Sequence, residues 1–240
     1  MSDVVIGFVL AAFIAAVAYV RQSLSRSGAI TAVIIGTIIY ASGGVFMMSV
    51  LLTFFVSSNV IGRLFKINKQ PAKRSAKQVL ANGLVATLLA VMFTMTQDES
   101  FLLLFVISIA VATADTWSSE LGVLSKTPPV SIVTFKATKY GVSGSVTKVG
   151  LLASFLGAIL ISSFVMFNLW VVLFGFLGSL FDSFLGHFQV RYLEPLTRDI
   201  VEDHEKSSTV LYHSGIRYLT NDGVNFISNV VTVLIAFLIL

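Results

Sequence analysis

Long runs of apolar residues, separated by short polar stretches, set the pattern of this chain. Most of the runs hold about 17 to 25 residues, which is enough for an α-helix to cross a bilayer. One further run, residues 28–41, is shorter and interrupted by glycine, so it fits a short or tilted span or a re-entrant segment. Counted as a span, it brings the predicted spans to eight, at 4–20, 28–41, 45–64, 76–95, 101–121, 149–167, 169–188 and 224–240.

This pattern predicts an all-α fold, a polytopic membrane helix bundle of about eight transmembrane helices in a single domain over residues 1–240. The composition agrees, because 56% of the residues are hydrophobic, 12% are charged and the mean hydropathy is +0.91. Such a chain is too apolar for a soluble domain. It contains no cysteine, which excludes disulfides and thiolate chemistry. The first run lacks the basic leader and cleavage site of a signal peptide, so we expect a retained span.

The charged residues divide the loops into two classes. All 16 Lys and Arg residues fall in or beside the loops that follow the first, third, fifth and seventh spans. The loops of the other face carry only Asp98 and Glu99. Because basic loops usually mark the cytoplasmic side, we expect these loops inside and both termini outside. Treating residues 28–41 as non-spanning would break this division.

Acidic residues meet apolar runs at three places. Asp115 and Glu120 lie in VATADTWSSELG, Asp182 lies in GSLFDSFLGHFQ and Asp222 lies in NDGVNFISN. An Asp at the centre of a membrane helix costs about 2.5 to 3.5 kcal/mol, so it normally faces a wet cavity or a partner. A structural ion pair is the alternative for any one of them. Since the predicted topology brings all four to the cytoplasmic level, the pattern favours a functional site.

Helical geometry limits which of these groups act together. Asp115 and Glu120 are five residues apart and point about 140° away from each other, so they cannot share one ion without a break in the helix. Carboxylate and amide oxygens, without Cys or clustered His, suit Mg²⁺ held between one or two carboxylates and substrate phosphates.

Lysines and glycines at the same level are candidates for binding the phosphates. The Gly-rich segment TKYGVSGSVTKVG allows the backbone to approach an anion closely. The alternative is that the lysines set topology and attract anionic lipid headgroups. No GxxxxGK[ST] motif occurs, which excludes a Walker-type nucleotide site. Residues 194–206 are expected to form a solvated loop of mixed charge. Taken together, the acids, lysines and apolar bundle indicate phosphoryl transfer onto a lipid at the cytoplasmic surface.

Six motifs occur in the order FFVSSNVIGR, KRSAKQVLANG, ATADTWSSELG, GVSGSVTKVGLLAS, GSLFDSFLGHFQ and NDGVNFISN. In these motifs the chain resembles the integral membrane family of plant phytyl-phosphate kinase and animal transmembrane protein nineteen, formerly a domain of unknown function. The resemblance runs from about residue 25 to the C-terminus. It implies a Mg²⁺-dependent kinase that transfers a phosphoryl group from CTP or ATP to an isoprenyl monophosphate, giving the diphosphate.

The resemblance also implies which residues form the site. Asp115 and Asp182 are expected to bind Mg²⁺, with Glu120 and Asp222 as further catalytic or positioning groups. The expected phosphate-binding and substrate-binding groups are Lys77, Asn82, Lys136, Lys139, Lys148, Gly141, Gly144, Asn221 and Asn225. The implied partners are the lipid phosphate, the nucleotide and the membrane, with no nucleic acid.

Two questions stay open at this point. The intramembrane acids would also serve a transporter or flippase for an isoprenyl phosphate or another anion, although the outer halves of the spans hold only scattered serines. Small residues permit close helix contacts, within one chain or in a homodimer, at Gly150, Ser154, Gly157, Gly175, Gly178 and Ser179.

Overall fold

The structure is a computed structural model that describes residues 2–65, 73–195, 200–202 and 210–240. In this part of the chain, seven α-helices are long and apolar enough to cross a membrane. The helices are α1 Asp3–Val20, α2 Arg26–Leu64, α3 Ala76–Thr96, α4 Glu99–Gly122, α5 Lys148–Ser162 with a short 3₁₀ turn η1 Ser163–Val165, α6 Leu169–Gly186 and α7 Asn221–Ile239.

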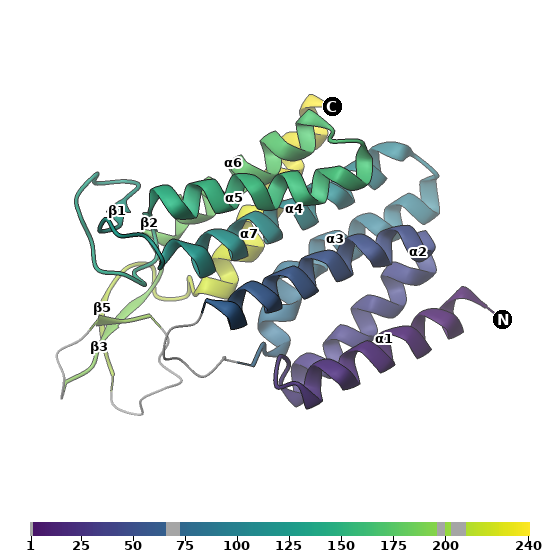
Figure 1. The fold of residues 1–240 in the computed structure, drawn as a ribbon, viewed down its shortest axis with the longest axis horizontal. Helices are drawn as coiled ribbons and strands as arrows, with labels where there is room; N and C mark the ends of the chain where they lie inside the picture. The colour runs from purple at the N-terminus through teal and green to yellow at the C-terminus, as the bar shows by residue number, and fades with distance from the viewer. Residues whose placement is uncertain (1, 66–72, 196–199, 203–209) are drawn as a thin grey trace.

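Two small antiparallel sheets lie in the connections at one end of the bundle (Figure 1). β1 Val130–Ser131 pairs with β2 Ser145–Val146 between α4 and α5. β3 Arg191–Leu193 lies between β4 Ile200–Val201 and β5 Leu211–Ser214 in the connection from α6 to α7. The apolar pattern did not predict these strands, because each holds only two to four residues and none forms an apolar run.

Helix α2 is folded into a hairpin. Gly43 and Gly44 leave the helical conformation, and Gly44 has φ of +57°, which an L residue rarely adopts. A Cβ built on Gly36 would lie 3.7 Å from the Met48 side chain, so the two arms pack side by side (Figure 1). A straight helix of 39 residues would instead be about 58 Å long. The eight predicted helical segments are therefore present as seven helices, one of them bent in two.

Helix α4 is the central element of the bundle. Helices α2, α3, α5, α6 and α7 all pack against it. Its middle, from Leu104 to Ala114, is buried throughout. Both polar residues of this stretch are hydrogen-bonded. Thr113 Oγ1 donates to the Ile109 carbonyl at 2.7 Å. Ser108 Oγ donates to Asn229 Oδ1 on α7 at 2.8 Å, and Asn229 Nδ2 donates to the Ser108 carbonyl at 3.0 Å. This pair fixes α7 against the centre of the bundle.

Small residues on α5 and α6 let these helices approach α4 closely. An added Cβ would meet Ala114 at Gly157, Ala110 at Gly175 and Val111 at Gly178, all within 3.2 Å. Gly150 faces Ser118 in the same way. The small residues singled out in the sequence thus pack helices of one chain together.

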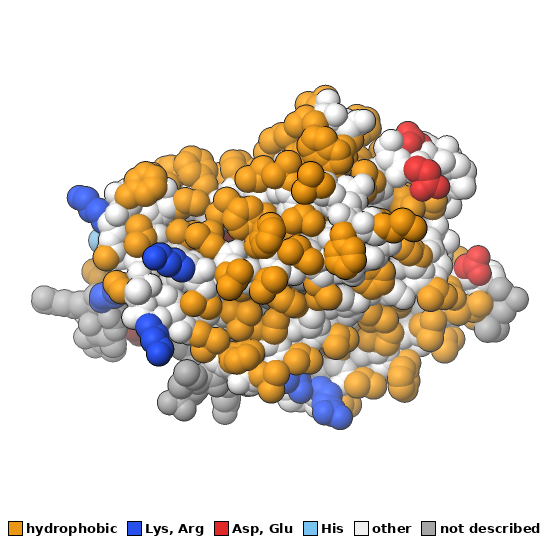
Figure 2. All heavy atoms as spheres, turned by 45° about the horizontal axis from the view of Figure 1, so that its top comes forward, with side chains coloured by type: hydrophobic (Ala, Val, Ile, Leu, Met, Phe, Trp, Pro, Cys, Tyr) orange, Lys and Arg blue, Asp and Glu red, His pale blue; other side chains and the backbone are white. Residues whose placement is uncertain are grey.

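The outside of the bundle is apolar over the helices and charged at the ends. Hydrophobic side chains cover the helical face in Figure 2, as expected for contact with lipid. Lys and Arg side chains in this view lie toward the end with the strands and along the lower edge, and acidic side chains stand out at the opposite end. The loop between α3 and α4, which holds Asp98 and Glu99, lies away from the strands (Figure 1).

Candidate functional site

A polar cavity of about 290 Å³ opens at the end of the bundle that carries the strands. Its walls come from the last turns of α4 and α6, the first turns of α3 and α7, and the loop of residues 140–147. Segments that are far apart in sequence therefore meet here. All four acids singled out in the sequence line it: Asp115, Glu120, Asp182 and Asp222.

Asp115 on α4 and Asp182 on α6 lie next to each other on the wall of the cavity. Their carboxyl groups are close enough to hydrogen-bond to each other. Asp182 is only 8% exposed. Two carboxylates in such contact repel each other unless a proton or a cation lies between them. The close packing of α6 on α4 at Gly175 and Gly178 is what brings the two acids together.

Helix α7 orients Asp182 from the other side. Ser228 Oγ donates to Asp182 Oδ2 at 2.7 Å. Asn225, with its amide nitrogen turned toward the oxygens that face it, donates to the same Oδ2 at 3.2 Å and to the Asn221 carbonyl at 3.0 Å. The Thr220 hydroxyl caps the helix by accepting from the amide of Gly223 at 3.3 Å. The NDGVN motif is thus the first turn of α7, which ties one carboxylate of the pair in place.

Glu120 and Arg74 form a second charged part of the cavity. A Cβ added to Gly62 would lie 3.2 Å from the Glu120 carboxylate, so this glycine gives the acid its room beside α2. Burial lowers the pKa of the Arg74 guanidinium, and the negative charge of Glu120 acts in the opposite direction. The backbone of Arg74 pairs with the chain before α2, from Ser23 to Ser25. Arg74 is thereby fixed at the entrance of α3.

The Gly-rich loop, residues 140–147, covers one side of the cavity. Gly141 and Gly144 both have φ of +81°, a backbone conformation that L residues rarely adopt. The space around the two glycines differs. A Cβ on Gly141 would meet nothing within 4 Å, whereas a Cβ on Gly144 would lie 2.5 Å from His187 Cα. Gly141 therefore leaves the cavity open to a ligand, and Gly144 is needed to seat the loop on the end of α6.

Glu202 holds the loop from outside. Its carboxylate accepts from Ser143 N at 2.9 Å and from Ser143 Oγ at 2.6 Å, and it lies 3.5 Å from Arg191 Nε. Arg191 also donates to the Ser143 carbonyl at 3.1 Å, and Gln189 donates to Ser143 Oγ at 2.9 Å. The prediction that residues 194–206 form a solvated loop is therefore wrong for Glu202. Composition could not show this, because the contact joins residues 59 apart.

The predicted lysines do not line this cavity. The side chains in question are exposed at Lys77, Lys136, Lys139 and Lys148. On α3 it is Gln78 and Asn82 that face the cavity, and one residue of helical rotation turns Lys77 away. Among the described residues, the basic side chain that lines it is Arg74. The sequence offered one signal for Arg74, since it directly precedes the capping box of Ser75 and Gln78 that starts α3.

Asn82, Asn221 and Asn225, which were predicted to bind the substrate, lie on the cavity wall. The end of the Asn225 side chain is 3.5 Å from Asn82 Oδ1, so α7 and α3 come close to each other across the cavity. Hydroxyl groups of Ser118, Ser119 and Ser183 add to the wall, and the sequence reasoning had not selected them as substrate-binding groups. Serines are too common near the ends of spans to stand out without a structure.

The cavity offers carboxylate oxygens, the ligands that Mg²⁺ prefers. Within the described residues, no group of three or more His, Asp or Glu side chains gathers closely enough to hold a metal ion by itself. The Asp115 and Asp182 pair supplies two hard oxygen ligands, which is the usual protein share of a Mg²⁺ site completed by water and phosphates. The pair fits such a site. It does not fit a structural zinc site, which needs four protein ligands.

The fold and cavity define a polytopic α-helical membrane protein with paired acids at one end of the bundle. The chain belongs to the family of integral membrane proteins DUF92, whose family model matches residues 9–233. This confirms the membership inferred from the motifs.

Two relatives align with this chain over most of their length. "Uncharacterized membrane protein MJ0933" of Methanocaldococcus jannaschii is 37% identical over 177 residues, covering 69% of this chain and 74% of the relative. "Protein PGR" of Arabidopsis thaliana is 31% identical over 266 aligned positions, covering 93% of this chain and 91% of the relative. No solved structure matches the chain.

Proposed function

We propose that this protein is a Mg²⁺-dependent membrane kinase that transfers a phosphoryl group from CTP or ATP to an isoprenyl monophosphate of the phytyl or polyprenyl type. The observation that carries the proposal is the contact of Asp115 with Asp182 in a polar cavity at the end of an otherwise apolar bundle. Buried paired acids are costly without a cation. A lipid substrate and a charged co-substrate can both reach this level of the bundle.

The residues divide into three roles. Asp115 and Asp182 would hold the metal, which when bound neutralises charge on the transferred phosphoryl group. Ser228 and Asn225 hold Asp182 in one orientation. Arg74, Asn82 and the open backbone at Gly141 offer donors for phosphate oxygens. In such chemistry the protein mainly positions groups and stabilises charge. The carboxylates, amides and Arg74 that line the cavity suit this role.

The reaction balances without a further reactant. A non-bridging oxygen of the lipid monophosphate attacks the γ-phosphorus of the nucleotide, and the bond from that phosphorus to the β–γ bridging oxygen breaks. The products are the lipid diphosphate and a nucleoside diphosphate. Because the attacking phosphate is already an anion near neutral pH, no strong base is needed, and none of the acids has to abstract a proton.

The basic end of the bundle is proposed to face the cytoplasm, with both termini on the other side. Cytoplasmic loops carry an excess of Lys and Arg, and the nucleotide is available on that side. Away from the cavity, α4 is buried among apolar residues, and its polar Ser108 is bonded to Asn229. Beyond the cavity, Thr232 Oγ1 on α7 likewise donates to the Ser228 carbonyl. These buried polar groups bond to each other within the described chain, which favours an enzyme over a transporter or flippase.

The proposal is tested by a transfer assay with detergent-purified protein, Mg²⁺, nucleotide labelled at the γ-phosphate and a panel of isoprenyl monophosphates. Asp182→Asn keeps the shape of the side chain and should lower the rate about 100-fold or more, since it removes a preorganised charge at the reacting group. Asp98→Asn is the matched control, because Asp98 caps α4 in the loop away from the cavity and Asn caps equally well. Folded wild-type protein that labels no lipid phosphate with either nucleotide would refute the kinase.

A further inference from the structure

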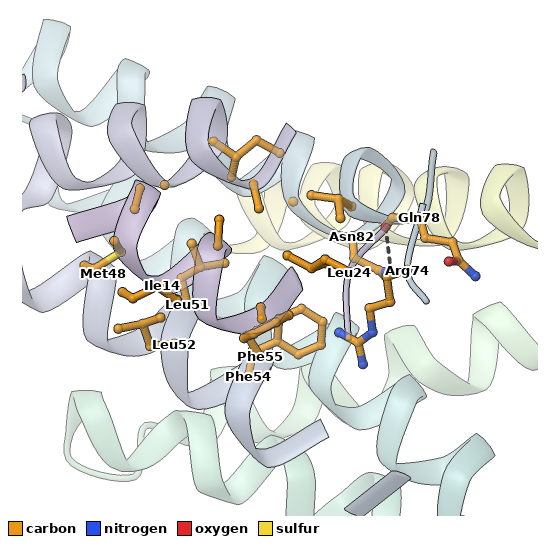
Figure 3. Close-up of a pocket in the computed structure, with 18 residues that line it drawn as sticks. Ile14, Leu24, Met48, Leu51, Leu52, Phe54, Phe55, Arg74, Gln78 and Asn82 are labelled. Carbon is orange, nitrogen blue, oxygen red and sulfur yellow. Dashed lines mark hydrogen bonds between the residues drawn. The ribbon is translucent and has the colours of Figure 1, made fainter. Parts of the chain in front are cut away.

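An apolar groove lies beside the polar cavity and shares part of its wall. The groove runs between α1, both arms of α2 and α3. Three residues line both spaces: Arg74, Gln78 and Asn82. Figure 3 shows these three side chains at one end of the groove and Met48, with Leu52, toward the other. The two spaces therefore adjoin at Arg74.

Apart from the three shared residues, the lining of the groove is apolar. Small residues such as Ala15, Ala32 and Gly83 leave room between the helices, while Ile14 and Leu51 form its walls. An apolar cavity holds water poorly and accepts apolar ligands. In a bundle surrounded by lipid, a hydrocarbon chain is the ligand with this chemistry.

Arg74 gives the groove a charge at the end that meets the cavity. Its guanidinium lies 5.6 Å from the ring centre of Phe54 and 5.8 Å from that of Phe55, so aromatic faces hold it in place. No hydrogen bond joins the guanidinium to another residue of the described chain. Its planar set of five N–H donors matches two oxygens of a phosphate. The groove thus pairs an apolar lining with a cation that complements a phosphate.

We propose that the groove binds the lipid substrate, with the phosphate at Arg74 and the first part of the isoprenyl chain between α1, α2 and α3. This rests on the proposed function and adds to it the place and orientation of the lipid. The groove has a volume of about 80 Å³. An apolar cavity of about 150 Å³ holds one benzene molecule, so the groove, at about half that volume, encloses part of the first isoprene unit. The rest of the chain lies in the bilayer beside α1.

The size of the groove defines the specificity. The phosphate and the first isoprene unit contact the protein, and the units beyond it do not. Isoprenyl monophosphates of ten and twenty carbons should therefore bind with similar affinity once both are fully partitioned into the membrane. The corresponding alcohols should bind weakly, because they offer no phosphate oxygens to the Arg74 guanidinium.

Photo-crosslinking tests the groove without any need for catalysis. The full-length protein in lipid nanodiscs is labelled with geranylgeranyl monophosphate that carries a diazirine in its first isoprene unit, and the labelled peptides are identified by mass spectrometry. Label is expected on α1, α2 and α3, with displacement by unlabelled geranylgeranyl monophosphate and not by geranylgeraniol.

A substitution that fills the groove with a larger side chain should block binding of the lipid. Ala32 lines the groove, so Ala32→Phe should lower labelling by about tenfold or more, equal to 1.4 kcal/mol of binding. Ala16→Phe makes the same change on the exposed side of α1 and should leave labelling unchanged. Ile14→Phe fills the same groove from α1, and serves if Ala32→Phe does not fold.

The outcomes separate this inference from the proposed function. If the groove is labelled but folded protein transfers no phosphoryl group, the lipid site is supported and the kinase activity is refuted. Transfer that continues with label on α5 or α6 alone, unaffected by Ala32→Phe, would overturn the groove and keep the kinase. Displacement by dioleoyl phosphatidic acid as strong as that by geranylgeranyl monophosphate would overturn the assignment to an isoprenyl chain.

Discussion

Replacing Gly144 with Ala tests whether the Gly-rich loop takes its shape from its seat on α6. A Cβ at this position would lie 2.5 Å from His187 Cα and 2.6 Å from its backbone nitrogen. Carbon atoms pack at about 3.5 to 4.0 Å, so the loop would have to move by about 1 Å. Backbone on both sides of the contact leaves no flexible side chain to give way.

Gly141→Ala is a matched control within the same loop. Both glycines have φ of +81°, so each substitution carries the cost of an L residue in the left-handed region, about 1 to 2 kcal/mol. Only Gly144→Ala adds a steric clash, because a Cβ on Gly141 has nothing within 4 Å. Overpacking typically costs about 1 to 3 kcal/mol more. The difference between the two variants isolates the contact with α6.

Hydrogen exchange of the peptide that contains Ser143 measures this difference, because the Ser143 amide is bonded to Glu202 only while the loop is seated. Exchange should quicken by about 5-fold to 30-fold in Gly141→Ala, and by about 5-fold to 150-fold more in Gly144→Ala. A displacement of about 1 Å in a catalytic loop can also cost about 100-fold in rate, which the transfer assay would detect in Gly144→Ala. Equal exchange in the two variants would refute the reasoning.

Three further predictions follow from single contacts. Arg74→Lys keeps the charge but loses the planar set of donors, so the KM for the lipid phosphate should rise about tenfold with a smaller change in kcat; an unchanged KM would remove Arg74 from the phosphate site. Glu202→Gln weakens the charge-assisted bonds to Ser143 by about 1.5 to 3 kcal/mol, and exchange in the loop should quicken while unfolding of the bundle in detergent stays as in wild type. Asn229→Ala leaves the Ser108 hydroxyl without its partner and should lower the free energy of unfolding by about 1 to 3 kcal/mol, measured by denaturant titration in detergent, with no change in KM.

The sequence by itself determined the helical segments and the end of the bundle at which the acids lie. Apolar runs fix which residues lie in lipid, because the cost of unsatisfied backbone in a bilayer leaves the helix as the local solution. The distribution of charge among the loops also predicted that residues 28–41 and 45–64 are two separate spans. In the structure the turn between them lies at Gly43 and Gly44. The motifs predicted that the acids of three segments belong to one site, and the structure places them on one cavity.

Only the tertiary structure decided which groups share that cavity and how. Asp115 meets Asp182 because α4 and α6 pack closely at their glycines, and no local pattern encodes the rotation of one helix against another. For the same reason the exposed lysines were predicted as phosphate ligands, whereas Arg74, fixed by pairing with the chain before α2, is the basic side chain that lines the cavity in the described part of the chain. Periodicity reports the face of a single helix, whereas the contacts that select Arg74, hold Ser143 by Glu202 and open the apolar groove join residues far apart in the chain.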